Sequence, residues 1–126
     1  MDKEIIKTSQ APGPIGPYSQ AVKAGGMLFI SGQIALKPGT SELITDNVTN
    51  ETEQVMQNLE AILGEAGLGF RNVVKTTIFL KEMNLFADVN EVYGSFFEAD
   101  FPARETVAVK GLPKDVNVEI SMIAAE

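Results

Sequence analysis

Residues 48–66 carry apolar side chains at every third or fourth position, which places them on one stripe of an amphipathic helix. The stripe consists of Val48, Thr52, Val55, Met56, Leu59, Ile62, Leu63 and Ala66. Asn47 is among several candidate N-caps before it, and Gly67 directly after it is typical of a helix end. A helix of this kind must bury its stripe against a second layer, so the chain cannot fold from strands alone.

The segments on both sides of this helix have strand patterns. Residues 20–24 and 27–31 flank Gly25 and Gly26, a glycine pair that favours a tight hairpin turn. Strands are also predicted over residues 73–80, 104–109 and 116–124, and a second helix over residues 85–97. The order strand, strand, helix, strand, helix, strand, strand predicts an α+β fold with two helices on one face of a sheet.

The composition limits the chemistry that this fold can support. The chain has 126 residues without a repeat or linker, so we expect one domain over residues 1–126. It contains neither Cys nor His, which excludes thiol nucleophiles, thiolate metal sites and imidazole bases. Any catalysis therefore depends on carboxylates, hydroxyls, Lys, Arg, backbone groups and water.

The charge pattern limits the partners. The formal net charge is −7, and the lysines are spread along the chain without a basic run. A polyanion would need clustered cations, so we do not expect nucleic acid as a partner. No apolar stretch approaches the roughly 20 residues that a bilayer span needs, and we expect a cytoplasmic protein without a membrane partner.

Arg104 and Glu119 are the first candidates for chemistry. If the last two predicted strands form a hairpin closed by residues 110–115, Thr106 lies opposite Glu119 and Arg104 opposite Ser121, all on one face. Arg104 could then bind a substrate carboxylate while Glu119 polarises a water molecule. The alternatives are a solvated Arg104, or ion pairs in which Glu119 joins Arg104 or a lysine across the sheet.

Two segments near the N-terminus offer further candidates. Tyr18 follows the rigid GPIGP segment, and its phenol can stack on a ligand or donate a hydrogen bond, although packing of a loop is the commoner use of Tyr. Ser31 and Gly32 end the second predicted strand, where Gly32 would let a ligand approach the backbone. A simple turn at the strand end explains these two residues equally well.

Six motifs follow one another along the chain: IGPYSQAV, FISGQI, VVKTTIFL, VNEVYGSFF, FPARETVAV and LPKDVNVEISMIA. Together, and in this order, they resemble the RidA (YjgF) family of reactive-intermediate deaminases. The resemblance implies a chorismate-mutase-like fold with a mixed sheet, and homotrimers with three clefts between subunits. It also implies cofactor-independent hydrolysis, without a metal, of 2-iminobutanoate and 2-iminopropanoate, the tautomer of 2-aminoacrylate. The products are 2-oxo acids and ammonia, and the imines come from pyridoxal-phosphate enzymes.

The resemblance also implies roles for particular residues. Arg104 would bind the substrate carboxylate, Glu119 would position or activate water, and Tyr18 would border and close the cleft. Substrate-binding positions or subunit boundaries fall on Ser31, Gly32, Asn90 and Thr106. Thr106 stands where many members have Cys, and because the reaction needs no thiol, we expect hydrolysis to survive this difference.

Two other functions remain open at this point. A non-catalytic trimer could bind small 2-oxo acids or act on client proteins, since binding needs Arg104 as much as hydrolysis does. A ribonuclease follows an older label for relatives of the family, but the acidic charge and the absence of His disfavour it.

Overall fold

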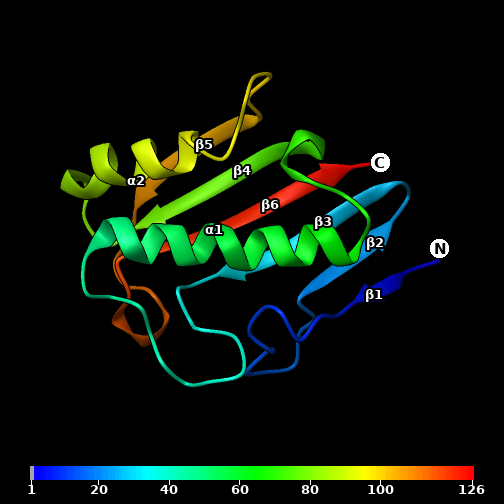
Figure 1. Ribbon diagram of the computed structural model, residues 1–126, viewed down its shortest axis with the longest axis horizontal. Helices are drawn as coiled ribbons and strands as arrows, with labels where there is room; N and C mark the ends of the chain where they lie inside the picture. The colour runs from blue at the N-terminus through cyan, green and yellow to red at the C-terminus, as the bar shows by residue number, and fades with distance from the viewer. Residues whose placement is uncertain (1) are drawn as a thin grey trace.

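The computed structural model describes residues 2–126, which form one six-stranded sheet and two α-helices (Figure 1). The strands are β1 (Glu4–Ile6), β2 (Ala21–Ala24), β3 (Met27–Gln33), β4 (Val73–Leu80), β5 (Ala103–Ala108) and β6 (Val118–Ala125). The helices are α1 (Val48–Glu65) and α2 (Phe86–Gly94), with short 3-10 turns at Phe70–Asn72, Met83–Leu85 and Pro113–Asp115. The spatial order is β1-β2-β3-β6-β4-β5, and only β4 and β5 are parallel. The predicted α+β class with a mixed sheet is confirmed.

Most of the predicted elements are present. β2 and β3 form the expected hairpin, with Gly25 and Gly26 in the left-handed region at φ 60° and 76°. β4 coincides with the predicted strand, whereas α2 ends at Gly94 rather than at residue 97. Phe96 and Phe97 instead pack beyond the helix end, against Phe70. The short strand β1 was not predicted.

Both ends of α1 follow from local sequence. Asn47 caps the start, because its Oδ1 accepts a hydrogen bond from the Asn50 N–H at 2.8 Å. Gly67 lies past the end with φ 76°, and the Leu68 N–H donates back to the Leu63 carbonyl at 2.9 Å. The predicted cap at Gly67 is therefore confirmed.

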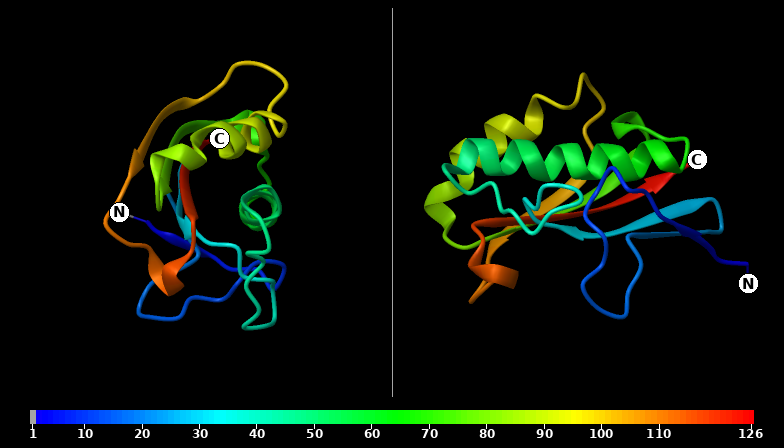
Figure 2. Two further views of the ribbon diagram at one scale, coloured as in Figure 1. Left: turned by 90° about the vertical axis from the view of Figure 1, so that its left-hand side faces the viewer. Right: turned by 60° about the horizontal axis from the view of Figure 1, so that its bottom comes forward.

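The two helices cover one face of the sheet, as predicted (Figure 2). On β6, Val118, Ile120, Met122 and Ala124 are buried under α1 and α2, while the residues between them point to the other face. That other face, called here the open face, carries a row of residues in register across four strands: Ile5, Val22, Phe29 and Ile123. Phe29 is 46% exposed, so the open face presents apolar surface.

The predicted hairpin between the last two strands is wrong. β5 pairs only with β4, which lies between β5 and β6. The physical reason is the crossover through α2, which brings the chain back to lay β5 parallel to β4. The connection after β5 then passes the end of β4 to reach β6 on its other side (Figure 1).

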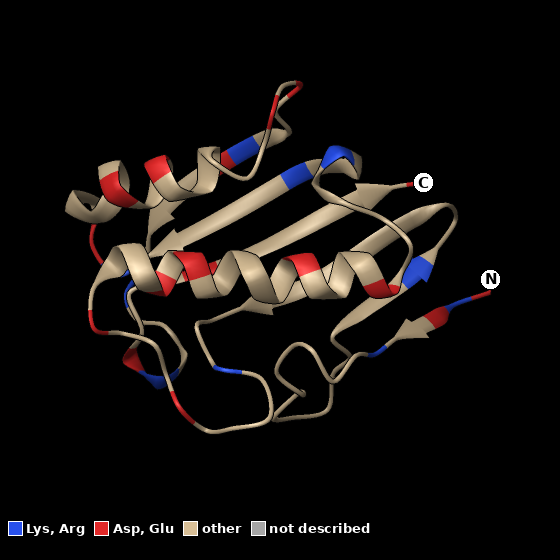
Figure 3. Cartoon of the chain, viewed as in Figure 1, with Lys and Arg blue, Asp and Glu red and all other residues tan. Residues whose placement is uncertain are grey.

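Charge is dispersed over the molecule. Lys and Arg lie on several separate elements (Figure 3). None of the helices formed by residues 2–126 combines the length and the apolarity that crossing a bilayer requires.

Candidate functional site

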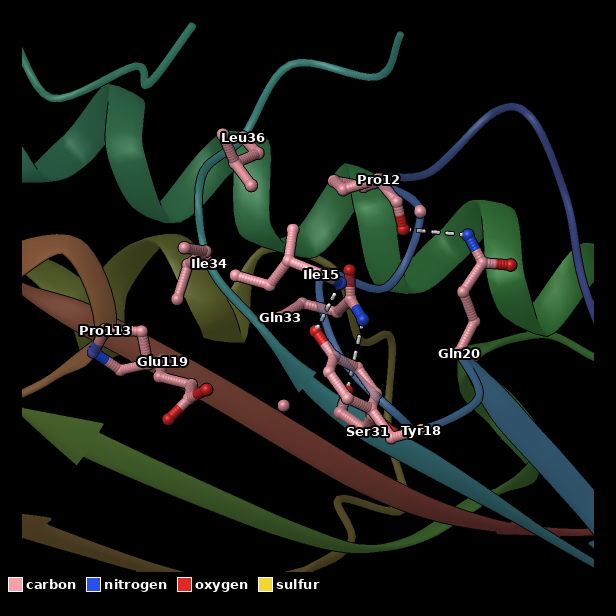
Figure 4. A pocket seen from close by; sticks show the side chains of 12 residues that line it. Pro12, Ile15, Tyr18, Gln20, Ser31, Gln33, Ile34, Leu36, Pro113 and Glu119 are labelled. Carbon is pink, nitrogen blue, oxygen red and sulfur yellow. Dashed lines mark hydrogen bonds between the residues drawn. The ribbon is translucent and has the colours of Figure 1, made fainter. Parts of the chain in front are cut away.

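A cavity of about 430 Å³ lies at one end of the sheet and is bordered by four of the predicted site residues. They are Tyr18, Ser31, Gly32 and Glu119. Figure 4 shows Glu119 and Pro113 on one side of the cavity, with Pro12, Ile15 and Tyr18 across from them. The structure therefore brings together residues from the N-terminal loop, β3 and β6.

The N-terminal loop that carries Tyr18 is held by the buried side chain of Gln20. Its Nε2 donates to the Thr8, Ala11 and Pro12 carbonyls at 3.0, 3.3 and 2.8 Å, and its Oε1 accepts from the Thr8 N–H at 2.7 Å. One amide thus replaces the regular backbone bonds that the loop lacks. Sequence reasoning missed Gln20, because nothing in the local pattern separates it from an ordinary strand residue.

Ser31 and Tyr18 are also tied to their surroundings. The Ser31 hydroxyl donates to the Ser19 carbonyl at 2.6 Å, so its proton is committed while its oxygen can still accept. The Tyr18 hydroxyl accepts a long hydrogen bond of 3.4 Å from the Ile15 N–H, and the side chain is half exposed. Tyr18 therefore borders the cavity from the exposed edge of the loop, and its hydroxyl proton is free for a ligand.

The carboxyl group of Glu119 rests against the backbone of Gly32. β3 has a bulge between Ile30 and Gln33, and a Cβ atom at Gly32 would lie 2.7 Å from Glu119 Oε2. The glycine thus makes room for the protein's own carboxyl group. Partial burial raises the pKa of Glu119, and within residues 2–126 no hydrogen bond or ion pair reaches its carboxyl group.

Arg104 belongs to a second group of residues, beside α2. Its guanidinium lies over the rings of Tyr93 and Phe86, at 5.1 and 5.6 Å from their centroids, and Nη1 donates to Asn90 Oδ1 at 2.8 Å. A separate cavity of about 480 Å³ opens here, lined by Asn90, Tyr93, Gly94, Phe101, Pro102 and Arg104. The remaining guanidinium donors are available to a carboxylate.

Arg104 forms no ion pair with any of residues 2–126. The salt bridges among residues 2–126 join Lys23 to Glu126, Lys75 to Glu105 and Lys81 to Asp115. The alternatives in which Arg104 or a lysine pairs with Glu119 are therefore wrong for the chain by itself.

The surroundings of Arg104 include Phe86 and Tyr93, two residues of the helix predicted over residues 85–97 that were not among the predicted site residues. Tyr93 is buried, and its hydroxyl donates to Thr76 Oγ1 at 2.9 Å, which fixes the ring beneath the guanidinium. Burial raises the pKa of Tyr93, so the phenol stays protonated and keeps this hydrogen bond. Phe86, Asn90 and Tyr93 are three or four residues apart and therefore lie on one side of α2. Their contacts with Arg104 could be predicted only if β5 were known to lie next to α2.

The two groups lie on opposite faces of the sheet, so the predicted sharing of one face is wrong. Arg104 pairs with Thr76 and Thr106 with Ile78, both on the helix-covered face. Glu119 pairs with Phe79, on the open face. The error follows directly from the misplaced hairpin, because inserting β4 between the two strands changes which residues are neighbours. One chain therefore does not bring Arg104 and Glu119 into one site.

Thr106 has a buried hydroxyl oxygen without a hydrogen-bond partner among residues 2–126. An unsatisfied buried hydroxyl destabilises a fold, and a methyl group of similar shape does not. We expect Thr106→Val to raise the free energy of unfolding by up to about 1 kcal/mol, measured by urea denaturation. Thr106→Ala, which also removes the methyl group, is the control and should lower it. A loss larger than about 1 kcal/mol in Thr106→Val would show that the hydroxyl has a partner in the assembled protein.

Comparisons with known proteins cover nearly the whole chain. The family model described as endoribonuclease L-PSP matches residues 8–126. A RutC family protein of Synechocystis is 56% identical, and the match covers 98% of this chain and 97% of the relative. A protein of Mus musculus named 2-iminobutanoate/2-iminopropanoate deaminase is 44% identical over 124 residues, which span 98% of this chain and 92% of that protein.

Solved structures agree with the fold. The crystal structure of Escherichia coli TdcF with bound serine has a TM-score of 0.93 and 44% identity, and covers 98% of each chain. The crystal structure of the Escherichia coli YjgF gene product has a TM-score of 0.92 and 45% identity, again over 98% of each chain. The six-stranded sheet with its two helices is therefore shared with these proteins.

Proposed function

The chain belongs to the RidA (YjgF) family, and from this membership we propose that it hydrolyses reactive 2-imino acids to 2-oxo acids and ammonia. The proposed substrates are the 2-iminopropanoate and 2-iminobutanoate that pyridoxal-phosphate enzymes release. The observation that carries the proposal is that the guanidinium of Arg104 and the carboxyl group of Glu119 are both left without a partner of opposite charge among residues 2–126.

The proposed reaction needs only positioning and proton transfer. Arg104 binds the carboxylate, with its guanidinium held by Asn90 and the rings of Phe86 and Tyr93. Glu119 takes a proton from water as the oxygen adds to the carbon of the protonated imine, and returns it to the nitrogen. The C–N bond then breaks, ammonia leaves, and the hydroxyl proton is lost to solvent as the carbonyl of the 2-oxo acid forms. Its raised pKa makes it a stronger base than an exposed carboxylate.

We propose that each complete site forms between two subunits of a homotrimer. The Arg104 group, with Asn90 and Thr106, would come from one subunit, and the Glu119 group, with Tyr18, Ser31 and Gly32, from its neighbour. Two features support this arrangement. The groups lie on opposite faces of one chain, and the open face carries the apolar row at Ile5, Val22, Phe29 and Ile123, which association would bury. Light scattering that gives a stable monomer near 13.6 kDa would overturn it.

A coupled assay tests the catalytic proposal. A pyridoxal-phosphate dehydratase generates the imine, and 2-oxo acid and ammonia are followed with and without this protein. We expect wild type to accelerate imine loss, and Glu119→Gln to lower the acceleration by about 10²- to 10⁴-fold while 2-oxo acid affinity stays within about threefold. Glu53→Gln is the matched control, since Glu53 is an exposed glutamate on α1 outside both cavities. Acceleration that survives in Glu119→Gln would contradict the role of this carboxylate.

A binding function is the second candidate, favoured by the TdcF relative whose crystal structure contains bound serine. In this reading the assembled clefts hold small 2-oxo or amino acids without converting them. If wild type does not accelerate imine loss in the coupled assay but binds 2-oxo acids through Arg104, the binding function replaces hydrolysis.

The description of the family model keeps RNA cleavage as a third, weaker candidate. A net charge of −7 and dispersed cations oppose binding of a polyanion (Figure 3). RNA cleavage that persists through purification and is lost in Arg104→Ala would revive it.

A further inference from the structure

We propose that the cavity beside Glu119 holds the substrate's side chain, and that its wall of Ile15, Ile34, Leu36 and Pro113 selects 2-imino acids with extended aliphatic side chains. This inference rests on the proposed function, because it assigns a place to the side chain of the same substrate. It goes further in naming which imino acids the site favours and which residues decide it.

The size and lining of the cavity are the first support. Its volume of about 430 Å³ corresponds to roughly fourteen water molecules at roughly 30 Å³ each, and a methyl or ethyl side chain fills only a small part of this. Figure 4 shows Ile34, Leu36 and Pro113 along one side, and Ile15 facing them. Away from Glu119 the surface is therefore mainly hydrocarbon.

Apart from Glu119 and Tyr18, the polar side chains that line the cavity form hydrogen bonds within the protein. Gln20 uses its amide on the Thr8, Ala11 and Pro12 backbone, and Gln33 Nε2 donates to the Ser31 carbonyl at 3.2 Å. The Ser31 hydroxyl donates to the Ser19 carbonyl. A polar substrate side chain would find only the Tyr18 hydroxyl and the Glu119 carboxyl group as partners and would lose more hydrogen bonds to water than it gains, whereas an apolar one loses nothing by entering.

One wall of the cavity is anchored to the core, and the side chain of Ile15 opposite it is exposed. The buried side chain of Asn58 donates through Nδ2 to the Ile34 and Leu36 carbonyls at 3.1 and 2.9 Å, which anchors that segment to α1. Ile34 and Leu36 also pack with buried Val116. Ile15 is 68% exposed on the loop opposite, so its side chain can close over a ligand and can be replaced without removing core contacts.

The test compares imines of different side chains, generated in place from amino acids by an L-amino acid oxidase with oxygen, with catalase removing the peroxide. Each buried methylene contributes about 0.8 kcal/mol, equivalent to about fourfold in kcat/KM. We expect kcat/KM to rise by about that factor per methylene from the alanine-derived to the norvaline-derived imine. The leucine-derived imine should exceed the isosteric asparagine-derived imine by at least about tenfold.

The variant Ile15→Ser tests whether Ile15 is responsible for the preference for long aliphatic side chains. We expect it to lower kcat/KM for the leucine-derived imine about tenfold and that for the alanine-derived imine much less, so that their ratio falls about fivefold. Met83→Ser is the matched control, since Met83 is 49% exposed and lies outside this cavity. It should leave the ratio unchanged.

Calorimetry that measures binding of the corresponding 2-oxo acids distinguishes failure of the side-chain subsite from failure of the proposed hydrolysis. If imines are hydrolysed but kcat/KM is equal across the series, or Ile15→Ser leaves the ratio unchanged, the side-chain subsite is overturned and the proposed function stands. If no imine is hydrolysed but 4-methyl-2-oxopentanoate binds more tightly than pyruvate in an Ile15-dependent way, hydrolysis fails and the subsite stands. If neither turnover nor preference is seen, both are overturned.

Discussion

Chains carrying Arg104→Ala and chains carrying Glu119→Gln should each be nearly inactive alone, and should regain about a quarter of the wild-type rate when they assemble together. The single variants each lose one half of the proposed site, and we expect at least a hundredfold loss in imine hydrolysis for each. In a mixed trimer, some clefts combine an intact Arg104 from one chain with an intact Glu119 from its neighbour. With equal, random mixing this pairing is about one in four.

The experiment uses co-expressed chains with different tags, and native mass spectrometry verifies that mixed trimers are present. The matched control mixes wild type with the double variant Arg104→Ala/Glu119→Gln. Sites between subunits give about a quarter of the wild-type rate in that mixture as well, whereas sites within single chains give about half. Verified mixed trimers of the two single variants without recovered activity would contradict a site shared between subunits.

Glu51→Ala should cause the largest loss of stability that we expect from a single substitution. Glu51 is fully buried in the first turn of α1, and its carboxyl group accepts from the Asn117 N–H, the Asn117 side chain and the Val118 N–H at 2.8, 2.7 and 3.3 Å. These bonds attach the start of β6 to α1, one residue before Glu119. Alanine leaves the backbone donors unsatisfied in the interior, at a cost of about 3 to 5 kcal/mol.

Thermal unfolding at one fixed protein concentration measures this loss, and we expect a decrease in Tm of roughly 10 to 20 °C. Glu53→Ala is the control, because Glu53 is exposed two residues along the same helix. It should change the free energy of unfolding by no more than about 0.5 kcal/mol. A similar small change in Glu51→Ala would show that β6 is held at this point by other contacts.

Local sequence patterns were sufficient to predict the helices and strands, but not which strands lie next to each other in the sheet. The apolar stripe of α1, its caps, the Gly25–Gly26 hairpin turn and β4 could all be predicted, because each depends on residues close in sequence. The insertion of β4 between β5 and β6 could not, because strand order depends on how the crossover through α2 packs on the sheet. That single difference moved Arg104 and Glu119 to opposite faces.

The sequence was sufficient to select candidate site residues. It did not identify the residues that hold the surrounding loops and strands in place. The absence of Cys and His, with only two arginines in the chain, left Arg104 and Glu119 as reasonable candidates. Glu51 illustrates the limit: its place in the first turn of α1 is typical of a residue that faces the helix dipole, yet it holds a strand 66 residues further along the chain. Gln20 and Asn58 likewise hold loops through long-range contacts that no local periodicity reports.

The segment from β4 through α2 to β5 carries the residues that surround the Arg104 guanidinium, whereas Glu119 and the N-terminal loop that borders its cavity come from the rest of the chain. Under the proposed assembly, the two parts of the machinery are thus inherited on separate stretches of one gene. After a gene duplication, one copy would be free to lose Arg104 and the other to lose Glu119. The two products would then be active only as a hetero-oligomer.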